Sequence, residues 1–274
     1  MRRAICTFSV GATFAFCAAS LHSGELAVFD SGEIAVSFDK RHFEKVELNI
    51  IPKCPGRASP EGATGPKRRV LTLRHQPRSA FKGAGRYYYP SSSAIYVTPL
   101  FDSSVKEFAA AYPSLHENAL GLRKLLLLSR REFEARAEQW KHPDPVQVPD
   151  EPFSNAGACL LAHYKRLNQP RCTGYRMLTY YRNGSAGYGA INAELQYQYQ
   201  GFTRDERFFI TAKLAVRHDL LPDSIDDARA ASDETPAEQL AERKGINRWK
   251  EDSFLPPLTV LDAMIGSLHI GPKS

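Results

Sequence analysis

The chain has 274 residues, of which 43% are hydrophobic and 24% are charged, and its formal net charge at pH 7 is +6. This length and apolar content are enough to bury a large core and fall within the upper range of a single domain. No helix or stripe gathers the cations, so the sequence lacks the pattern of a nucleic-acid-binding protein. The densest basic cluster, Lys67, Arg68 and Arg69, is placed inside a Gly/Pro-rich loop and is interpreted as a solvated loop, with a polyanion site as the alternative.

The first twenty residues have the pattern of a secretory signal. Arg2 and Arg3 precede an uncharged, mostly apolar run over residues 4–20 that closes on small residues. The run is short for a membrane-spanning helix, which needs about 20 predominantly apolar residues. We therefore expect cleavage after Ser20, or alternatively after Ser23, and a periplasmic or extracellular protein that meets the membrane only through this segment. An uncleaved anchor or a buried helix is the alternative.

Removal of this leader changes both the charge and the cysteine count of the chain. It leaves 34 Lys and Arg against 30 Asp and Glu, a net charge of +4, and it removes Cys6 and Cys17. Cys159 and Cys172 are then predicted to lie on neighbouring strands of one hairpin, where a disulfide would stabilise the fold by about 3 kcal/mol. The alternative, two buried free thiols, stays open. If the pair forms, Cys54 is left unpaired.

In the first half of the chain, alternating apolar residues predict short strands over residues 34–38 and 46–50. A loop rich in Gly, Pro and Ser is expected over residues 52–66. Further strands are expected over residues 70–73 and 95–97.

A helical section is predicted from residue 103 to residue 139. Pro113 is expected to end a first helix, and Ser114 with Glu117 to form the capping box of a second. The apolar residues of the second helix recur at helical spacing and predict one buried stripe. Prolines then crowd residues 141–156, which predicts an extended connector in which a helix cannot persist.

The second half predicts a four-stranded antiparallel meander over residues 160–167, 175–181, 194–200 and 208–217. The third strand has strict period two, so Tyr197 and Tyr199 are expected to face the core while the alternate residues face water. Helices are predicted over residues 236–244 and 257–268. The second of these has an inward stripe formed by Leu258, Leu261, Ile265 and Leu268.

Several short segments in both halves carry a resemblance to a known family. They are residues 34–39, 95–99, 175–181, 195–203 and 208–212, together with Ile191, Asn192, His218, Leu221 and Pro222. These segments resemble an uncharacterised family of bacterial exported proteins and lipoproteins, with coverage of most of residues 30–225. Glu206 departs from the pattern, because the family usually has glycine in that turn. The resemblance implies export and an α+β domain, and it brings no established activity.

Taken together, the elements predict one α+β domain over residues 21–274, in which an antiparallel sheet carries helices packed on one face. The residues of most chemical interest are on the polar side of the meander. Amide and guanidinium groups there are suited to a polar ligand or sugar, and the alternative is an exposed face that keeps the sheet soluble. The predicted ligand-binding residues are Arg176, Glu194, Gln196, Gln198 and Gln200, with Arg182 as a further candidate.

Catalytic and metal patterns are weak. The eight histidines include no pair at i, i+4 spacing and no His-x-Glu arrangement, so neither a metal nor a cofactor is expected. Cys159 and His163 would share an ion only if their segment were helical. Ser185, with His218 and Asp219, is a weak match to a hydrolase site because the glycine spacing of a nucleophile turn is absent.

The sequence therefore favours a non-catalytic exported protein that binds a protein partner or a small polar ligand and does not bind nucleic acid. The alternative is a secreted hydrolase whose site is not recognisable from sequence. Neither the ligand nor the oligomeric state follows from these residues.

Overall fold

The computed structural model describes part of the chain, and all structural statements below refer to that part. The described residues are 26–51, 67–76, 93–100, 110, 113–129, 131–133, 135, 157–158, 162–182, 190–224 and 245–271. Several predictions lie outside them: the leader with its cleavage site, the loop at 52–66, the connector at 141–156, the helix at 236–244, and the positions of Cys54, Cys159 and Ser185.

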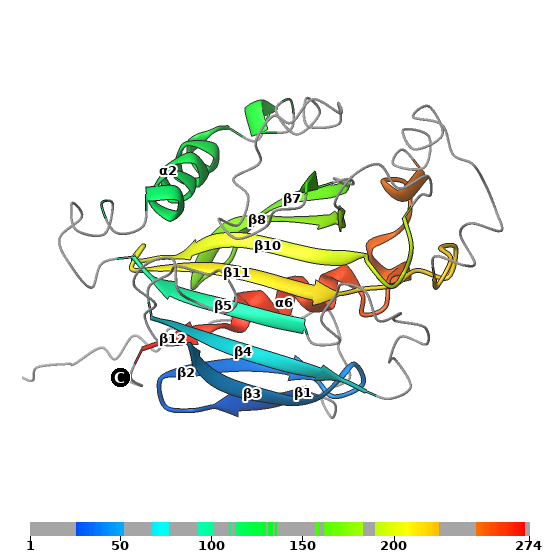
Figure 1. Ribbon diagram of the computed structural model, residues 1–274, viewed down its shortest axis with the longest axis horizontal. Coiled ribbons are helices and arrows are strands. Elements are labelled where there is room, and N and C mark those ends of the chain that lie inside the picture. Colours follow the sequence, from blue (N-terminus) through cyan, green and yellow to red (C-terminus); the bar gives the residue numbers. More distant parts are fainter. Residues whose placement is uncertain are drawn as a thin grey trace, which may run out of the picture.

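The largest element of the fold is a seven-stranded antiparallel sheet (Figure 1). Its strand order is β3-β4-β5-β11-β10-β8-β7. The strands are β3 (Phe43–Ile51), β4 (Arg68–His75), β5 (Ser93–Pro99), β7 (Ala162–Asn168), β8 (Cys172–Thr179), β10 (Gln196–Thr203) and β11 (Phe208–Ala215). The four strands of the predicted meander, β7, β8, β10 and β11, are consecutive neighbours, which confirms that prediction.

Two smaller sheets complete the strand structure. One has the order β1-β2-β12, and the other pairs β6 with β9. Their strands are β1 (Leu26–Asp30), β2 (Ile34–Asp39), β12 (His269–Ile270), β6 (Gly157–Ala158) and β9 (Tyr181–Arg182). The strands predicted in the first half of the chain are all present, as β2 to β5.

Two residues of the basic cluster, Arg68 and Arg69, open a strand, which corrects the prediction of a solvated loop for them, whereas Lys67 is exposed and precedes the strand. Arg68 and Arg69 are the first two residues of β4 and, because they are adjacent on a strand, they point to opposite faces. The Arg69 side chain forms an ion pair with Glu33 at 2.8 Å. The Arg68 guanidinium lies 5.6 Å from the centre of the Tyr96 ring. These cations therefore have partners within the fold.

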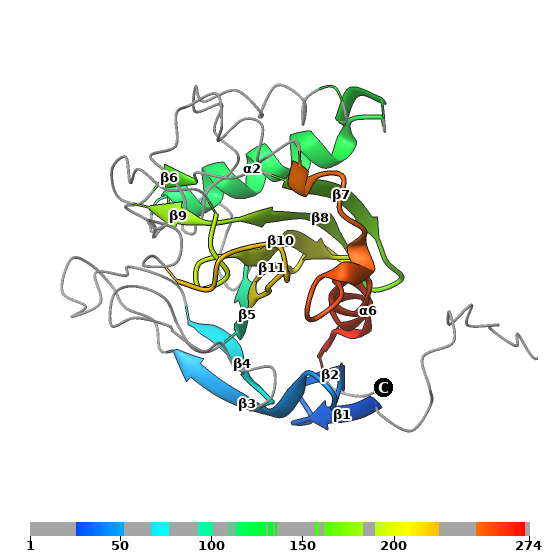
Figure 2. The ribbon, with the colours of Figure 1, turned by 90° about the vertical axis from the view of Figure 1, so that its right-hand side faces the viewer.

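Helices lie on both faces of the seven-stranded sheet, whereas the sequence predicted helices on one face (Figure 2). On β8, Tyr175 and Met177 join a buried cluster with residues of α2 (Pro113–Leu127). Leu178, whose side chain points to the other side, packs in the cluster that contains α6 (Leu258–Ser267). The sheet curves around α6, and the β1–β2 hairpin lies on the same side. The fold is thus mainly antiparallel sheet, with few helices and no uncovered face along β8 and β10.

The helix predictions hold for the C-terminal helix and need correction for α2. In α6 the predicted stripe is buried, since Leu258, Leu261, Ile265 and Leu268 are each at most 2% exposed. α2 begins at Pro113, where a first-turn residue needs no hydrogen-bonding N–H. Residue 110 is also helical, and the rest of the predicted first helix lies outside the described residues. Ser114 is the second residue of α2, so it does not precede the helix as the predicted cap does. Reciprocal capping bonds occur at Ser129 and Glu132.

No helix within the described ranges has both the length and the apolar character needed to cross a bilayer.

Cys172 is a free, buried thiol, so the predicted disulfide with Cys159 is absent. The register of the hairpin gives the reason. Cys172 lies at the turn end of β8, beside Asn168 and Thr173, which pair with each other. Ala162, at the start of β7, pairs with Leu178 at the far end of β8. Six residues of extended strand cover about 20 Å, far beyond the span of a disulfide.

Candidate functional site

Three glutamines of β10 lie on one face of the sheet, toward α2. Gln196, Gln198 and Gln200 are 6%, 0% and 1% exposed. Strand register places Thr179 of β8 beside Gln196, and Thr211 of β11 beside Gln200. Both threonines are buried as well. We call these five residues the glutamine face.

The burial of the glutamine face corrects the prediction that this side of the meander is wet. Every residue from Gln196 to Phe202 is buried, so both faces of β10 are covered. The alternation of polar and apolar residues correctly separates the two faces, because Tyr197 and Tyr199 point to the α6 side. However, the alternation of polar and apolar residues shows only that the two faces of the strand differ in polarity. It does not show that the polar face is exposed to solvent.

The hydrogen bonding of the glutamine face is incomplete. The Tyr175 hydroxyl donates to Gln200 Oε1 at 3.2 Å. The other amide atom of that side chain, Nε2, and the Oε1 atom of Gln196 are buried and have no hydrogen-bond partner. A buried polar atom left without a partner costs about 1–3 kcal/mol. Such atoms are uncommon in native proteins, where ordered water or a bound group supplies the missing bonds.

The residues beside the glutamine face contribute no negative charge. Met177 and Lys213 flank Gln198 on β8 and β11, and Tyr175 flanks Gln200. Lys213 is half-buried. Among the described residues that share this face on β8, β10 and β11 there is no carboxylate. The described residues of these three strands therefore bring no negative charge to the two amides.

The structure separates the other predicted site residues from the three glutamines. Glu194 lies in the turn before β10, where its backbone N–H donates to the Ile191 carbonyl at 3.1 Å. Arg176 is paired with Tyr199, so its side chain is on the opposite face of the sheet. Arg182 belongs to β9, outside the main sheet. Only Gln196, Gln198 and Gln200 of the predicted set are brought together.

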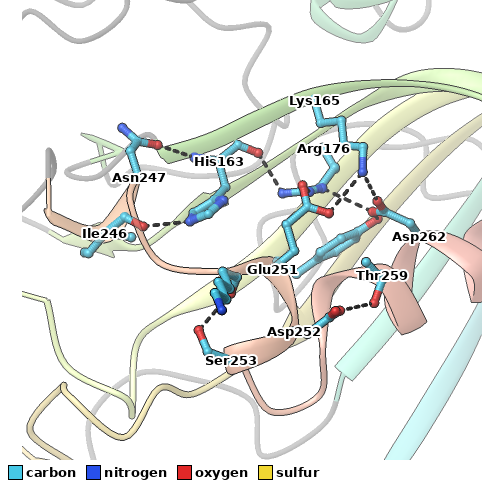
Figure 3. A network of polar contacts seen from close by, with 12 residues as sticks. His163, Lys165, Arg176, Ile246, Asn247, Glu251, Asp252, Ser253, Thr259 and Asp262 are labelled. Atoms are coloured by element: carbon cyan, nitrogen blue, oxygen red, sulfur yellow. Dashed lines mark hydrogen bonds and ion pairs between the residues drawn. The ribbon is translucent and has the colours of Figure 1, made fainter.

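Arg176 anchors a polar network on the α6 side of the sheet (Figure 3). Its side chain is completely buried. Nη1 donates to the His163 carbonyl at 2.8 Å, and Nε is 3.1 Å from Asp262 Oδ1. Nη2 forms an ion pair with Glu251. The guanidinium thus links β7 to α6 and to the short 3₁₀ helix η1 (Glu251–Ser253).

Lys165 completes this network, which we call the ion cluster: Lys165, Arg176, Glu251 and Asp262. Lys165 Nζ is 3.0 Å from Glu251 Oε2 and 3.3 Å from Asp262 Oδ2. The Tyr197 hydroxyl adds a hydrogen bond to Asp262 Oδ1 at 3.0 Å. Two cations balance two carboxylates, so the cluster has no surplus charge to offer a ligand. Its geometry is that of a brace between the sheet and the C-terminal segment.

The two carboxyl groups of the ion cluster are perturbed in opposite directions. Burial raises the pKa of Asp262, even though Arg176 and Lys165 favour its ionised form. Partial burial also acts to raise the pKa of Glu251, but Arg176 and Lys165 outweigh it and hold that pKa below the usual value. The difference follows from exposure, because the Asp262 side chain is 9% exposed and the Glu251 side chain 31%.

His163 holds the segment after residue 245 against β7. Its φ is 51°, in the left-handed region, where the register of β7 shifts between Ala162 and Lys165. Its backbone N–H donates to Asn247 Oδ1 at 2.7 Å, and its Nε2–H to the Ile246 carbonyl at 2.7 Å. Because the carbonyl requires a proton on Nε2, that nitrogen is not free to bind a metal.

His218 is likewise held in a structural role. The Leu220 N–H donates to its Nδ1 at 3.2 Å, which fixes the proton of the neutral ring on Nε2. Nε2 then donates to Ser253 Oγ at 2.9 Å, and that hydroxyl donates to the Lys250 carbonyl at 2.7 Å. The ring also stacks on Trp249 at 3.9 Å. In this arrangement His218 does not take a proton from Ser253.

Sequence reasoning missed the partners of Arg176. A signal for them exists in two places. Arg176 stands between the apolar residues Tyr175 and Met177 of a strand, and Asp262 follows Leu261 in an amphipathic helix. A charged residue in a strongly apolar stretch is seldom buried without a partner of opposite charge.

No protein-family model matches the chain, and no curated protein matches it. The described residues contain no group of three or more His, Cys, Asp or Glu side chains placed to hold a metal ion.

Proposed function

We propose that this protein is a non-catalytic binding protein that holds a small polar ligand on the glutamine face. The observation that carries the proposal is the pair of buried, unpartnered amide atoms, Gln196 Oε1 and Gln200 Nε2. A small ligand fits this location better than a protein surface does, because the three glutamines are at most 6% exposed.

The energetics of the sheet favour a binding role over a purely structural one. Buried amides with missing partners stabilise a core less than apolar side chains of the same shape would. A sheet face that served only to pack against α2 would be more stable with apolar residues, as Tyr175 and Met177 are elsewhere on that face. Polar groups retained at such a cost are typical of ligand sites.

The chemistry of the glutamine face supports holding a ligand rather than transforming it. Amide and threonine side chains do not exchange protons near neutral pH. The described ionisable side chains on this face of β8, β10 and β11 are the Tyr175 hydroxyl, which donates to Gln200, and Lys213, opposite Gln198. A general base and a nucleophile in hydrogen-bond contact, the minimum for acyl transfer, are not found among the described residues of this face.

We also propose that the protein is exported, on the strength of the N-terminal basic pair and apolar run. N-terminal sequencing of protein recovered from outside the cytoplasm tests this proposal. The expected first residue is Leu21, or Gly24 if cleavage follows Ser23. Recovery of the intact chain from the cytoplasm alone would contradict it.

The binding proposal is tested by thermal unfolding with a panel of small polar compounds. The panel contains neutral sugars, amino acids, dicarboxylates, nucleosides and inorganic phosphate. We expect at least one class to raise the midpoint temperature of the wild type, because a ligand that binds only the native state stabilises it. The response should be lost in Gln196→Met, which keeps the shape of the side chain and removes its amide.

Gln76→Met is the matched control for this experiment. The Gln76 amide donates to the Lys40 carbonyl at 2.8 Å in an exposed setting away from the glutamine face. This variant should respond to the panel like the wild type. A panel without any stabilising compound, or a response that persists in Gln196→Met, would refute binding at the glutamine face.

A further inference from the structure

We infer that the edge strand β1 is a self-association site, at which β1 of a second copy of this chain adds antiparallel to the β1-β2-β12 sheet. The contact does not involve the glutamine face. Its basis is the exposure of β1, the direction of the β1 backbone groups and the way the β1 sequence complements itself.

β1 forms the outer edge of its three-stranded sheet and lies at the margin of the molecule (Figures 1 and 2). No other described strand pairs with this edge. Two apolar side chains on one face of β1, Leu26 and Val28, are 49% and 69% exposed. Ala27 and Phe29, which point to the other face, pack against the core. An exposed apolar strand at a sheet edge is suited to pairing with another chain.

The other edges of the described sheets carry features that discourage edge-to-edge pairing. β3 has a register shift before Lys45 and an ion pair between Lys45 and Glu47. β7 has a register shift before Lys165, and Lys165 and Arg166 are exposed. β6, β9 and β12 have two residues each. β1 has none of these features, because its five residues pair with β2 in one continuous register and include neither lysine nor proline.

Hydrogen bonds along β2 determine which backbone groups of β1 point outward. The Ser31 N–H donates to the Ile34 carbonyl at 3.0 Å, so these residues form the hydrogen-bonded pair at the turn. Hydrogen-bonded and non-hydrogen-bonded pairs alternate in an antiparallel ladder, so the pair of Val28 and Ser37 is non-hydrogen-bonded. The Ser37 N–H accordingly points away from β1 and donates to Ser267 Oγ at 2.9 Å. The Val28 N–H and carbonyl therefore point to the outer edge, where an added strand would bind them.

The sequence of β1 matches itself when a second copy runs antiparallel about Val28. Val28 then lies opposite Val28 of the second copy, and the two residues exchange both backbone hydrogen bonds. Ala27 lies opposite Phe29, so a small side chain meets a large one beside the core. Leu26 lies opposite Asp30, which keeps the two Asp30 residues about 13 Å apart along the strands. The pairing thus brings no like charges of β1 together and joins the two three-stranded sheets into one.

Sedimentation equilibrium of the protein recovered after expression of the full chain tests this contact. The contact involves five residues of each copy, which is small for a stable interface, so we expect a weak and reversible dimer. The dimer should become populated as the protein concentration is raised to about 0.5 mM. No larger species should form, because a two-fold contact uses the β1 edge of both copies.

Two substitutions of Val28 act on the contact in different ways. Val28→Pro removes the outward N–H, and an edge strand tolerates proline where that N–H does not face its neighbour. Val28→Lys places two ammonium groups opposite each other. Each variant should keep the wild-type circular dichroism spectrum and weaken dimerisation by at least about tenfold. Leu220→Lys is the matched control, because Leu220 is 70% exposed and lies outside β1, and it should dimerise like the wild type.

Crosslinking tests the register of the two strands. In the proposed pairing the Cα atoms of the two Val28 residues are about 5.5 Å apart. A short bismaleimide should therefore join two copies of Val28→Cys efficiently, and should join Leu220→Cys no more than the wild type with its natural cysteines. A monomer at every concentration, which is expected if β1 takes a strand of a different protein, would overturn the inference. So would a dimer that neither Val28→Pro nor Val28→Lys weakens, or growth beyond the dimer.

Discussion

Replacement of Gln196 is expected to increase the stability of the protein and to weaken ligand binding. Its Oε1 atom is buried without a hydrogen-bond partner, and methionine replaces the amide with an apolar group of nearly the same shape. In the absence of ligand, Gln196→Met should raise the free energy of unfolding by about 1 kcal/mol. For a domain of this size that corresponds to about 2–4 °C in the midpoint temperature, measured by calorimetry or circular dichroism.

The opposite sign would be equally informative. If Gln196→Met lowers the free energy of unfolding in ligand-free protein, the amide contributes to the fold and its missing partner is supplied by ordered water. The glutamine face would then be a structural polar layer.

Arg176 and Lys165 allow the ion cluster to be tested as a brace. Arg176 is completely buried, and its removal leaves the buried Asp262 with only a half-exposed Lys165 as a charged partner. Arg176→Met should therefore lower the free energy of unfolding by about 3–5 kcal/mol. Lys165 is 43% exposed, so Lys165→Met should cost about 0–1 kcal/mol. Urea denaturation measures the free energy of unfolding of both variants. Equal decreases in the two variants would contradict the claim that buried Arg176 holds the C-terminal segment against the sheet.

For individual residues, the sequence indicated correctly which side chains share a face of a strand, but it did not indicate whether that face is buried or exposed. It correctly singled out Gln196, Gln198 and Gln200 as a set, because residues two apart on a strand share a face. It wrongly placed Arg176 with them. Arg176 is paired with Tyr199, and residues paired across an antiparallel ladder share a face, but that register depends on turn geometry that the sequence did not specify.

At the scale of elements, the contact between β8 and β10 depends on two opposed glycines. Gly174 pairs with Gly201, and the Tyr199 ring lies over both. A Cβ added at Gly201 would lie 2.1 Å from the Tyr199 hydroxyl oxygen and 2.5 Å from the Thr173 carbonyl oxygen. Because backbone and a buried ring must both move, Gly201→Ala should destabilise the protein by about 1–3 kcal/mol or more.

Gly245→Ala is the control for this substitution. A Cβ at Gly245 has no heavy atom within 4 Å. The free energy of unfolding of this variant should change by less than about 0.5 kcal/mol, because the added methyl group meets no neighbouring atom. A Gly201→Ala variant as stable as Gly245→Ala would show that the sheet has room at Tyr199 that the structure does not contain.

The pairing of β4 with β5 carries a pH-dependent contribution from His75. Burial lowers the pKa of His75 from 6.5 to about 4, and the neighbouring His42 adds to the effect. Between these two values the unfolded chain binds a proton at His75 and the native protein does not. Stability from this group is therefore complete above pH 6.5 and is lost as the pH falls toward 4, by up to about 3 kcal/mol.

Replacement of His75 by phenylalanine isolates that contribution. The ring contact with Phe43, at 4.9 Å between centroids, can be kept by another aromatic ring, and Ser93 keeps its bond from the Ala215 N–H at 2.9 Å. Free energies of unfolding measured from pH 7 to pH 4 should fall less steeply in His75→Phe than in the wild type. Parallel pH profiles would show that His75 is protonated in the native state.

The strands and helices were largely predictable from the sequence. Which helix covers which face of the main sheet was not. Hydrophobic period two identified the meander, and period 3.6 identified the buried stripe of α6. Neither period states which face of a sheet a helix will cover. The α2 and α6 helices lie far apart in the chain, and the side that each one takes depends on contacts with strands that are distant in sequence.

At the scale of the whole molecule, the placement of helices on opposite faces of the sheet gives the two polar groups different roles. On the α6 side, charge is balanced within the ion cluster, and each carboxylate has partners from two or more elements. On the α2 side, Gln196 Oε1 and Gln200 Nε2 are buried without a hydrogen-bond partner. The first arrangement fixes the C-terminal segment to the sheet, and the second is where we propose that a ligand binds.

Cys172, which was predicted to form a disulfide, instead packs as a free thiol on the α6 side of the sheet. Burial raises the pKa of Cys172 and keeps the thiol protonated, and its sulfur donates to the Ile265 carbonyl of α6 at 3.6 Å. The thiol is therefore part of the packing between β8 and α6, and no crosslink is required to hold those elements together.

The most direct test of the central claim is nuclear magnetic resonance of the glutamine side-chain amides. Their signals are assigned by their loss in Gln196→Met, Gln200→Met and Gln76→Met, and the wild type is then titrated with the compound of the panel that raises its midpoint temperature most. We expect the Gln196 and Gln200 amide signals to shift as the protein is saturated, while the Gln76 signal does not. Unchanged Gln196 and Gln200 signals at saturating ligand would contradict binding at the glutamine face.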